Sequence, residues 1–300
     1  MNRRDFIPLA AAGLLSGIAG FQGGRTTPLP GPDSAKVRLR KAQYEDDLTE
    51  FILESFHEQD LDVTGARVLL KPYLAGGANS THPAVVAAAY AAVEELGAAQ
   101  VWIGDATGGD ALALAEAAGY RHRIPNFEDV FVDLNCDDVC PVQGFLQGPE
   151  VYFPDTAIRA DLVISLGKLR TDRHYTVGGA ITNLFGLVPG SVYGWPQGAH
   201  PLATAAAASE LVRTFRRSFA IVDGIVALEG DGDPKALGML AMGRDLVAVD
   251  ATCSRVIGLN PKKIDHLRLS GAHGVLTEMG AEQTGESIES FRTSFRPASV

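Results

Sequence analysis

The fold is decided by residues 161–190, which read DLVISLGKLRTDRHYTVGGAITNLFGLVPG. The apolar run Leu162 to Leu166 is typical of a strand buried on both faces of a parallel sheet. The polar and basic residues Lys168 to His174 follow and predict a loop, and residues 180–187 predict a short helix. Because ligands bind beyond the carboxyl ends of the strands in open α/β sheets, this stretch predicts a ligand site.

Outward from this stretch, apolar strands alternate with helices and no internal repeat is found. We expect helices over 44–59, 83–96, 110–118, 201–217 and 246–258, and strands over 67–70, 100–103, 130–134, 150–153, 219–222 and 237–242. Residues 36–41 alternate in polarity and predict an edge strand, whereas the tail towards residue 300 is polar and poorly patterned. This order predicts the α/β class, with a doubly wound, mostly parallel sheet and helices on both faces.

The first residues have the layout of an export signal. Arg3-Arg4-Asp5-Phe6 precedes a weakly apolar run, Ile7 to Phe21, which is too short to span a membrane. The arginine pair favours a twin-arginine signal, and the alternative is a general secretory signal with a chance pair. We therefore expect a signal over 1–24, a linker over 25–35 and a single α/β domain over 36–300. The protein would be exported, to a periplasmic or other extracytoplasmic location, with the twin-arginine export machinery as a partner.

The bulk composition limits the classes of partner. The 300 residues are 46% hydrophobic and 21% charged, with a formal net charge of -10 and a pI of about 5.2. An acidic surface argues against nucleic acid and against anionic membranes, because both are bound through basic patches. A local basic pocket, for example one around Lys168 to Arg173, remains compatible with this balance.

The three cysteines are Cys136, Cys140 and Cys253. An iron–sulfur cluster held by this chain alone is not expected, since such clusters usually take four thiolates. Cys136 and Cys140 are separated by three residues rather than the usual two of a zinc or redox pair, and pairing or metal binding are both open to them. Cys253 lies in an apolar helical pattern that is typical of a protein core.

Charged residues follow four of the expected strands, at Lys71, Gly104-Asp105, Lys168 and Asp223-Gly224. If these strands are parallel, their ends share one edge of the sheet. Glu229 and Asp231 come from the loop after Asp223. Such a group of carboxylates and lysines suits a hard metal ion, a phosphate or a carboxylate. The alternative is structural, because Asp and Gly are favoured in turns and a lysine at a strand end often reaches solvent.

Four more polar residues are candidates, and three of them have a structural alternative. His82 precedes Pro83 at a helix start, where it either faces an anion or caps the helix. His174 is a general base or a solvated loop residue. Thr171 lies in the same segment, and Asn183 is an amide among apolar residues that needs a partner. The candidate sets are therefore Asp105, Lys168, His174 and Asp223 as catalytic residues, Lys71, His82, Thr171 and Asn183 as ligand-binding residues, and Glu229 and Asp231 as metal ligands.

The familiar catalytic motifs are absent from the sequence. There is no Gly-x-Ser-x-Gly elbow, no phosphate-binding Walker loop, no His-Glu-x-x-His and no Gly-x-Gly-x-x-Gly after the first strand. Asp250, a carboxylate in an apolar helix, is expected to make a hydrogen bond between that helix and a loop.

The ordered motifs of the chain resemble a known family. They are Lys71-Pro72, Thr81-His82-Pro83, Gly104-Asp105, residues 161–171, Gly179-Ala-Ile-x-Asn-Leu-Phe-Gly186, Asp223-Gly-Ile-x-Ala-Leu-Glu-Gly230 and Asp245-x-Val-Ala-Val-Asp-Ala251. Together they resemble the uncharacterised family known as domain of unknown function 362, often labelled iron–sulfur centre protein. The resemblance implies an α/β fold and a redox partner, and no settled reaction. The chain departs from the family pattern at Asp172, where a histidine is usual, and at Thr182, where a lysine is common.

The sequence leads to a principal hypothesis and one alternative. The principal hypothesis is an exported α/β protein of unassigned reaction that binds a small anionic molecule, with or without a divalent metal, in the crevice at the strand ends. The alternative is a non-catalytic periplasmic binding protein, or an accessory protein of a redox complex, that uses the same crevice.

Overall fold

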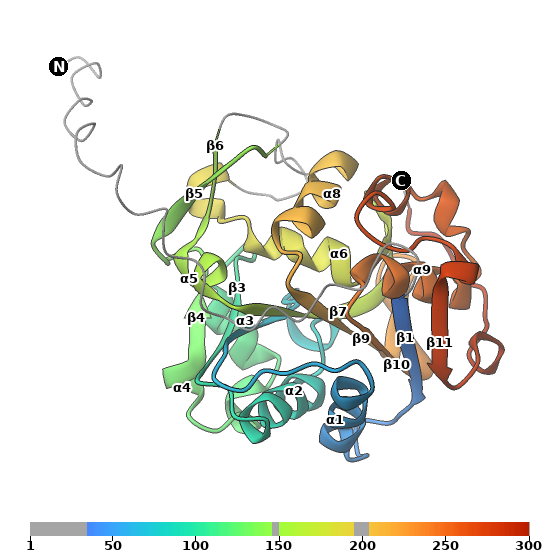
Figure 1. Ribbon diagram of the computed structural model, residues 1–300, viewed down its shortest axis with the longest axis horizontal. Coiled ribbons are helices and arrows are strands. Elements are labelled where there is room, and N and C mark those ends of the chain that lie inside the picture. Colours follow the sequence, from blue (N-terminus) through green and yellow to red (C-terminus); the bar gives the residue numbers. More distant parts are fainter. Residues whose placement is uncertain (1–34, 146–149, 195–203, 300) are drawn as a thin grey trace.

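A computed structural model describes residues 35–145, 150–194 and 204–299 (Figure 1). The expected signal and most of the expected linker therefore lie outside the described residues. The fold is built on a sheet with strand order β11-β1-β10-β9-β7-β2-β3-β4, and β8 pairs with β7. Its strands are β1 (Ala35–Lys41), β2 (Arg67–Pro72), β3 (Gln100–Asp105), β4 (Phe131–Asp133), β7 (Leu162–Asp172), β8 (Thr176–Gly178), β9 (Ser218–Glu229), β10 (Asp233–Gly243) and β11 (Ala281–Gly285).

The sheet is mostly parallel, as the sequence predicts. Strands β4, β3, β2, β7 and β9 all run in one direction. Strand β10 is antiparallel to β9, and β1 and β11 then return to the common direction. The parallel strands can read as continuous apolar runs because helices cover both of their faces. The α/β class is thereby confirmed.

Two apolar cores lie on the two faces of the sheet. Along β2, Leu69 belongs to one core and Leu70 to the other, since successive side chains of a strand point to opposite faces. The first core is covered by α5 (Asp155–Arg159), α6 (Ala180–Asn183), α8 (Ala205–Thr214), α9 (Leu246–Val256) and α10 (Asp265–Ser270). The second is covered by α1 (Leu48–Glu58), α2 (Pro83–Glu95), α3 (Ala111–Ala117) and α4 (Phe127–Val130). Figure 1 shows α1 and α2 on one side of the sheet and α6, α8 and α9 on the other.

The remaining elements are short. Strands β5 (Val139–Gln143) and β6 (Glu150–Pro154) form a separate antiparallel pair. A helix α7 (Gly190–Tyr193) and the 3-10 turns η1 (Gly77–Asn79), η2 (Tyr120–His122), η3 (Leu184–Leu187), η5 (Pro261–Lys263), η6 (Glu278–Gly280) and η7 (Ile288–Ser290) complete the described chain. None of the helices in this part of the chain is both long enough and apolar enough to cross a bilayer.

Three local expectations were wrong, each for a tertiary reason. The expected loop after Leu166 is largely strand, because β8 pairs with the end of β7 from Arg170 to Asp172. Strand β9 continues past Asp223 to Glu229, because β10 pairs with it as a hairpin. Strand β1 is interior rather than at the edge, because β11 from the weakly patterned tail pairs with its outer side.

Candidate functional site

The carboxyl-terminal ends of the parallel strands carry most of the predicted site residues. Lys71 is the last residue but one of β2 and Asp105 ends β3, while Lys168 and Asp223 lie within the longer strands β7 and β9. The four strands are parallel, so the expected common edge of the sheet is confirmed. The side chains nevertheless form two separate clusters at this edge, and a hollow adjoins only the first of them.

The first cluster is a buried ion pair with an amide beside it. The Nζ atom of Lys71 lies 2.7 Å from Oδ1 of Asp105 and donates hydrogen bonds to Asn183 Oδ1 at 2.8 Å and to the Pro72 carbonyl at 2.7 Å. The ammonium group thus donates two hydrogen bonds to protein acceptors and forms an ion pair with Asp105, whose Oδ1 is buried and makes no hydrogen bond to any described residue. Burial lowers the pKa of Lys71 and raises that of Asp105, and the attraction between the two charges opposes both shifts.

Asn183 comes to this pair from α6, far along the chain. Its Nδ2 donates to the Lys71 carbonyl at 2.8 Å and to Ser165 Oγ at 3.0 Å. Gly186, in η3, lies against the same pair, and a Cβ atom there would overlap both Asp105 Oδ1 and Lys71 Nζ. The expected need of Asn183 for a partner is met by the backbone and by Lys71, so the α6–η3 segment closes over the ion pair.

The start of α6 is itself fixed by Asp250 of α9. The Asp250 carboxylate accepts hydrogen bonds from Ala180 N at 2.7 Å and from Ile181 N at 2.9 Å. Burial raises the pKa of Asp250 to about 6, and the two N–H donors oppose that shift. This is the helix-to-loop hydrogen bond that the sequence predicts for Asp250, and it determines where Asn183 lies.

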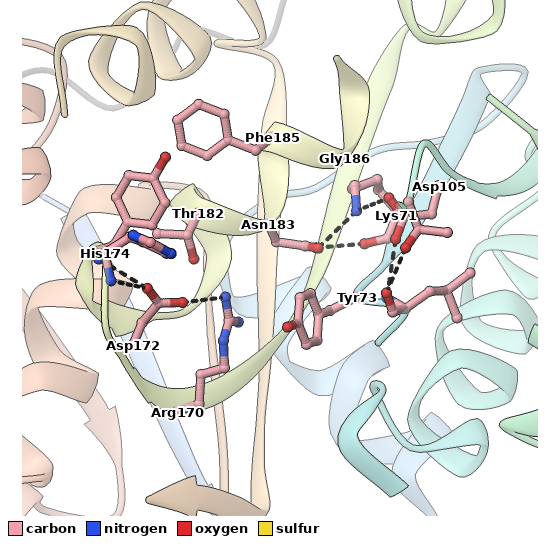
Figure 2. Close-up of a pocket in the computed structure, with 13 residues that line it drawn as sticks. Lys71, Tyr73, Asp105, Arg170, Asp172, His174, Thr182, Asn183, Phe185 and Gly186 are labelled. Carbon is pink, nitrogen blue, oxygen red and sulfur yellow. Dashed lines mark hydrogen bonds and ion pairs between the residues drawn. The ribbon is translucent and has the colours of Figure 1, made fainter. Parts of the chain in front are cut away.

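A hollow of about 160 Å³ opens beside the ion pair (Figure 2). Its lining consists of Lys71, Tyr73, Leu74, Asp105, Thr107, Arg170, Asp172, His174, Tyr175, Thr182, Asn183, Phe185 and Gly186. Figure 2 shows Lys71, Asp105 and Asn183 towards one side and Arg170, Asp172 and His174 towards the other. We call this hollow the strand-end pocket.

Arg170 is the second cation of the strand-end pocket. Its guanidinium lies over the Tyr73 ring at 4.1 Å from the centroid, and its Nη2 donates to Asp172 Oδ2 at 3.0 Å. Its Nη1 is buried and finds no hydrogen-bond partner within the described residues. Since buried polar groups are rarely left unpaired in folded proteins, this N–H group is an unsatisfied hydrogen-bond donor in a residue that lines the pocket.

Asp172 shapes the turn that carries His174. Its Oδ1 accepts hydrogen bonds from His174 N at 2.8 Å and from Tyr175 N at 3.0 Å. Burial acts to raise the pKa of Asp172, but Arg170 and these two N–H groups hold that pKa below its usual value. Asp172 is therefore an ionised turn-former, and the imidazole of His174 is left exposed at the rim of the pocket.

The apolar wall of the strand-end pocket is aromatic. The Tyr175 ring stacks on Phe185 with 5.1 Å between the centroids. Burial and the Asp172 carboxylate raise the pKa of Tyr175, so its hydroxyl stays protonated at neutral pH. Hydroxyl groups of Thr107 and Thr182 complete the lining, the first bonded to the Leu74 carbonyl and the second to Gly179. The pocket thus combines cations, hydroxyls and an aromatic surface.

The second cluster surrounds Lys168 and Asp223, which do not line the pocket. Lys168 Nζ donates to Asp223 Oδ2 at 2.8 Å and to the Tyr44 hydroxyl at 3.1 Å, and both charged side chains are fully buried. The Tyr44 hydroxyl lies 3.0 Å from Asp223 Oδ1 and accepts from Val226 N at 3.2 Å. This network joins the loop after β1 to the centre of the sheet.

His82 belongs to the second cluster. Its backbone N–H donates to Asp223 Oδ2 at 3.1 Å, and its ring stacks on Tyr44 at 3.6 Å. Its Nδ1 accepts from Ala84 N at 3.2 Å, which caps the start of α2. Burial lowers the pKa of His82, with Asp223 opposing. The capping role that the sequence offered as the alternative for His82 is therefore the one that its contacts show.

The remaining candidates lie near the carboxyl-terminal tail. Thr171 is buried, and its Oγ1 lies 3.5 Å from the Gly230 carbonyl. Glu229 pairs with Lys235 at 3.0 Å and with Arg296 at 3.2 Å, and Asp231 accepts from Ser299 N at 3.0 Å. None of the three lines the strand-end pocket. Within the described ranges no group of three or more His, Cys, Asp or Glu residues is arranged to hold a metal ion.

The cysteines are separate thiols in this structure. Cys136 is exposed, with Sγ 3.7 Å from Asp133 Oδ2, and Cys140 is half-buried, with Sγ 3.1 Å from Asp155 Oδ1. Cys253 is buried in the core, as its helical pattern predicts. Burial and the nearby carboxylates raise the pKa of Cys140 to about 11, which keeps that thiol protonated.

Several pocket residues carried no assignment from the sequence, namely Tyr73, Arg170, Asp172, Tyr175 and Phe185. Arg170 and Asp172 were expected in a loop that could line a local basic pocket, and Asp172 was noted as a departure from the family pattern, but neither was assigned as a site residue. A usable signal exists, because residues 170 and 172 point to one side if the segment is a strand. Tyr44, in the second cluster, had no comparable signal, since nothing local indicates that it reaches Asp223 across 179 positions.

Comparison with known proteins gives a family and a few relatives. A family model described as "Domain of unknown function (DUF362)" matches residues 68–255. A curated relative, a thylakoid-associated protein of Synechocystis, is 31% identical over 213 residues, which is 67% of this chain and 65% of that protein. The chain thus spans less than two thirds of this relative's length.

Solved structures resemble the fold at low identity. The lactate racemase apoprotein of Thermoanaerobacterium thermosaccharolyticum has a TM-score of 0.48 at 13% identity, over 77% of this chain and 59% of that one. A protein of Thermotoga maritima has a TM-score of 0.42 at 14% identity, over 77% and 60% respectively.

Proposed function

We propose that the strand-end pocket of this chain, which belongs to the family described as domain of unknown function (DUF362), binds a small organic anion. The observation that carries the proposal is the position of Arg170. This guanidinium lines the pocket, and its buried Nη1 finds no hydrogen-bond partner within the part of the chain that the structure describes. A carboxylate or phosphate oxygen would supply the missing acceptor, since guanidinium groups match the geometry of both.

The charges of the pocket limit how the anion is held. Lys71 and Arg170 carry two positive charges and Asp105 and Asp172 two negative ones, so the formal charge of the lining is zero. The pocket therefore attracts an anion only weakly through net charge, and directional hydrogen bonds must supply its selectivity for that anion. The ligand would place its acidic group on Arg170 and an apolar part against the ring of Phe185 or Tyr175.

The size of the pocket favours a ligand of few atoms. Its volume of about 160 Å³ is below the roughly 300–1,000 Å³ of pockets that take drug-sized ligands. Short-chain carboxylates and small phosphate esters meet this limit. Divalent metal would enter with the ligand, because the described residues provide no three-carboxylate or histidine group at which it could bind alone.

A non-catalytic binding role is the second candidate function. The observation that favours it is the network in which Lys71 Nζ is held by hydrogen bonds to Asn183 and the Pro72 carbonyl and by an ion pair with Asp105. To act as an acid or a base, Lys71 would have to lose one of these bonds. An accessory protein of a redox complex, which the family label suggests, would use the pocket in this way.

Export remains part of the proposal. It rests on Arg3-Arg4 and the weakly apolar run that follows, both outside the described residues. Fusion of residues 1–35 to a reporter that folds before export would test it. Export that stops when Arg3 and Arg4 are both replaced by Lys supports a twin-arginine route, and export that continues contradicts it.

The binding proposal is tested by calorimetric titration of the exported protein with short-chain mono- and dicarboxylates and inorganic phosphate. We expect Arg170→Gln to weaken binding about tenfold or more, because a charged hydrogen bond contributes roughly 1.5–3 kcal/mol. Arg173→Gln is the matched control, since this exposed arginine lies in the same segment but does not line the pocket. Equal losses in the two variants, or no binding by the wild type, would contradict the proposal.

The same samples separate the two candidate functions. Recovery of chemically altered ligand after incubation would favour an enzyme, and recovery of unaltered ligand would favour a binding protein. Elemental analysis of the protein before and after ligand addition shows whether a divalent metal accompanies the anion.

A further inference from the structure

A second hollow lies at the opposite edge of the sheet from the strand-end pocket. Its volume is about 250 Å³, and its lining is Val212, Arg213, Phe215, Arg216, Ser218, Arg244, Asp245, Leu246 and His273. Ser218 begins β9, and β10 ends at Gly243 beside Ala220, so the hollow lies where the parallel strands start. We call it the strand-start pocket. Nothing in the proposed function uses it.

The strand-start pocket is basic, although the whole chain is acidic. Arg213, Arg216 and Arg244 contribute three positive charges and Asp245 one negative charge, so the lining has a formal charge of +2 with neutral His273. The chain as a whole has a formal charge of -10. An anion approaching this edge is therefore attracted by a local potential of the opposite sign to that of the protein.

The one carboxylate of this lining, Asp245, accepts hydrogen bonds from backbone N–H groups. Asp245 caps α9 by accepting from Ala248 N at 3.0 Å, and its other oxygen accepts from Val275 N at 2.7 Å. Its two oxygens are thus occupied by the backbone, and it does not form an ion pair with the arginines in the described part of the chain. Asp245 therefore does not neutralise the arginines of the pocket through an ion pair in the part of the chain that the structure describes.

The arginines differ in how they are held. Arg213 pairs with Glu210 on its own helix at 2.6 Å. Arg244 Nη1 donates to the carbonyls of Gln59 at 3.1 Å and Asp60 at 3.3 Å, which fixes the side chain across the pocket. Arg216 is exposed and makes no side-chain hydrogen bond or ion pair to any residue that the structure describes. The pocket therefore has one anchored guanidinium and one that is free to close on a ligand.

The floor of the strand-start pocket is apolar. Val212, Phe215 and Leu246 are all buried and all line it. An inorganic anion would leave this floor in contact with water, whereas an anion with an apolar body would cover it. Pockets for organic ligands usually have this make-up, with an apolar lining and a few polar groups that fix the orientation.

We propose that the strand-start pocket is a second binding site, for a phosphate monoester whose apolar group lies on Phe215 and whose phosphate lies between Arg216 and Arg244. A phosphate suits this site because it accepts bidentate hydrogen bonds from guanidinium groups and carries up to two negative charges. The apolar floor selects esters over free phosphate. The site is independent of the strand-end pocket and of the function proposed for it.

The test is titration of the full chain with phenyl phosphate, with inorganic phosphate as the comparison. We expect Arg216→Gln to weaken phenyl phosphate binding about tenfold. Arg217→Gln is the matched control, because it removes the same charge from the adjacent exposed residue, which does not line the pocket, and should change affinity less than twofold. Arg170→Gln in the other pocket should leave this affinity unchanged.

Three outcomes would overturn the proposal. They are equal losses in the Arg216 and Arg217 variants, equal affinity for phenyl phosphate and inorganic phosphate, and no binding of phenyl phosphate by the wild type. Loss of binding in Arg170→Gln alone would place the ester in the strand-end pocket instead. Neither Arg216→Gln nor Arg217→Gln is expected to alter folding, since both side chains are exposed.

Discussion

The ammonium group of Lys71 and the carboxylate of Asp105 form an ion pair, 2.7 Å between Nζ and Oδ1, with exposed fractions of only 1% and 4%. Neighbouring parallel strands bring the two residues together at one edge of the sheet. Charges this deeply buried are tolerated only when each satisfies the other. The pair is therefore both a wall of the strand-end pocket and a point at which the fold is vulnerable.

Removal of one partner should destabilise the protein strongly. Lys71→Met leaves the Asp105 carboxylate buried without a cation, and breaking such a pair costs about 3–5 kcal/mol. Urea unfolding at neutral pH would measure the loss, and the double variant Lys71→Met with Asp105→Asn should recover part of it. Arg268→Gln is the control, because its pair with Asp265 is exposed and should contribute about 1 kcal/mol or less. A similar loss of unfolding free energy in Lys71→Met and Arg268→Gln would contradict the stabilising role of the buried Lys71–Asp105 pair.

Gly186 should not accept a side chain. A Cβ atom there would overlap the Lys71–Asp105 pair, and overpacking of this kind costs about 1–3 kcal/mol. We expect Gly186→Ala to lower the midpoint of urea unfolding. Gly109→Ala is the matched control, since the nearest atom to its added Cβ would be Leu114 Cδ1 at 3.8 Å. An unfolding midpoint for Gly186→Ala equal to that of the control would show that η3 does not close over the pair.

Asp250 should make the protein less stable as pH rises through weakly acidic values. Burial raises its pKa to about 6 from an ordinary value of 3.8, so the folded state binds a proton that the unfolded state releases. Stability is therefore fully present below pH 4 and is lost as pH rises to 6, by about 3 kcal/mol. Unfolding free energies of wild type and Asp250→Asn, compared at several pH values, should diverge over this window. If the unfolding free energies of the two proteins instead changed in parallel with pH, the raised pKa of Asp250 would be contradicted.

His266 should have the opposite effect. It is buried, with Nε2 unpartnered among the described residues, and burial lowers its pKa to about 4 from 6.5. The unfolded state then binds the proton, so stability is lost as pH falls from about 6.5 towards 4. His266→Gln should remove this acid sensitivity, whereas His57→Gln, at an exposed histidine, should retain it. The measurement is the same series of unfolding free energies.

The Tyr44 hydroxyl should contribute measurably to stability. It bonds to Asp223, Lys168 and Val226 N in the second cluster. Tyr44→Phe removes the hydroxyl and leaves these buried groups short of a partner, at a cost of about 1–3 kcal/mol. Hydrogen exchange should also become faster at the Val226 amide. Tyr90→Phe, at a half-exposed tyrosine, is the control, and an equal effect there would contradict the role of the network.

The amino-acid sequence determined the class of the fold and the edge of the sheet that carries the charged residues. Apolar runs such as Leu162 to Leu166 are typical of strands buried on both faces, and parallel strands place Lys71, Asp105, Lys168 and Asp223 at one edge. Asp250 was also legible as a helix-to-loop contact, because a lone carboxylate in an apolar helix must find donors.

Only the tertiary structure decided which of these residues share a pocket. Lys168 and Asp223 join Tyr44 and His82 in one network, while Lys71 and Asp105 join Asn183 and the strand-end pocket. These groupings depend on strand order, on the face to which each side chain points, and on the β8 and β10 pairings that extend β7 and β9. Such contacts link residues more than 100 positions apart, as Lys71 and Asn183 show, and no local pattern of the chain encodes them.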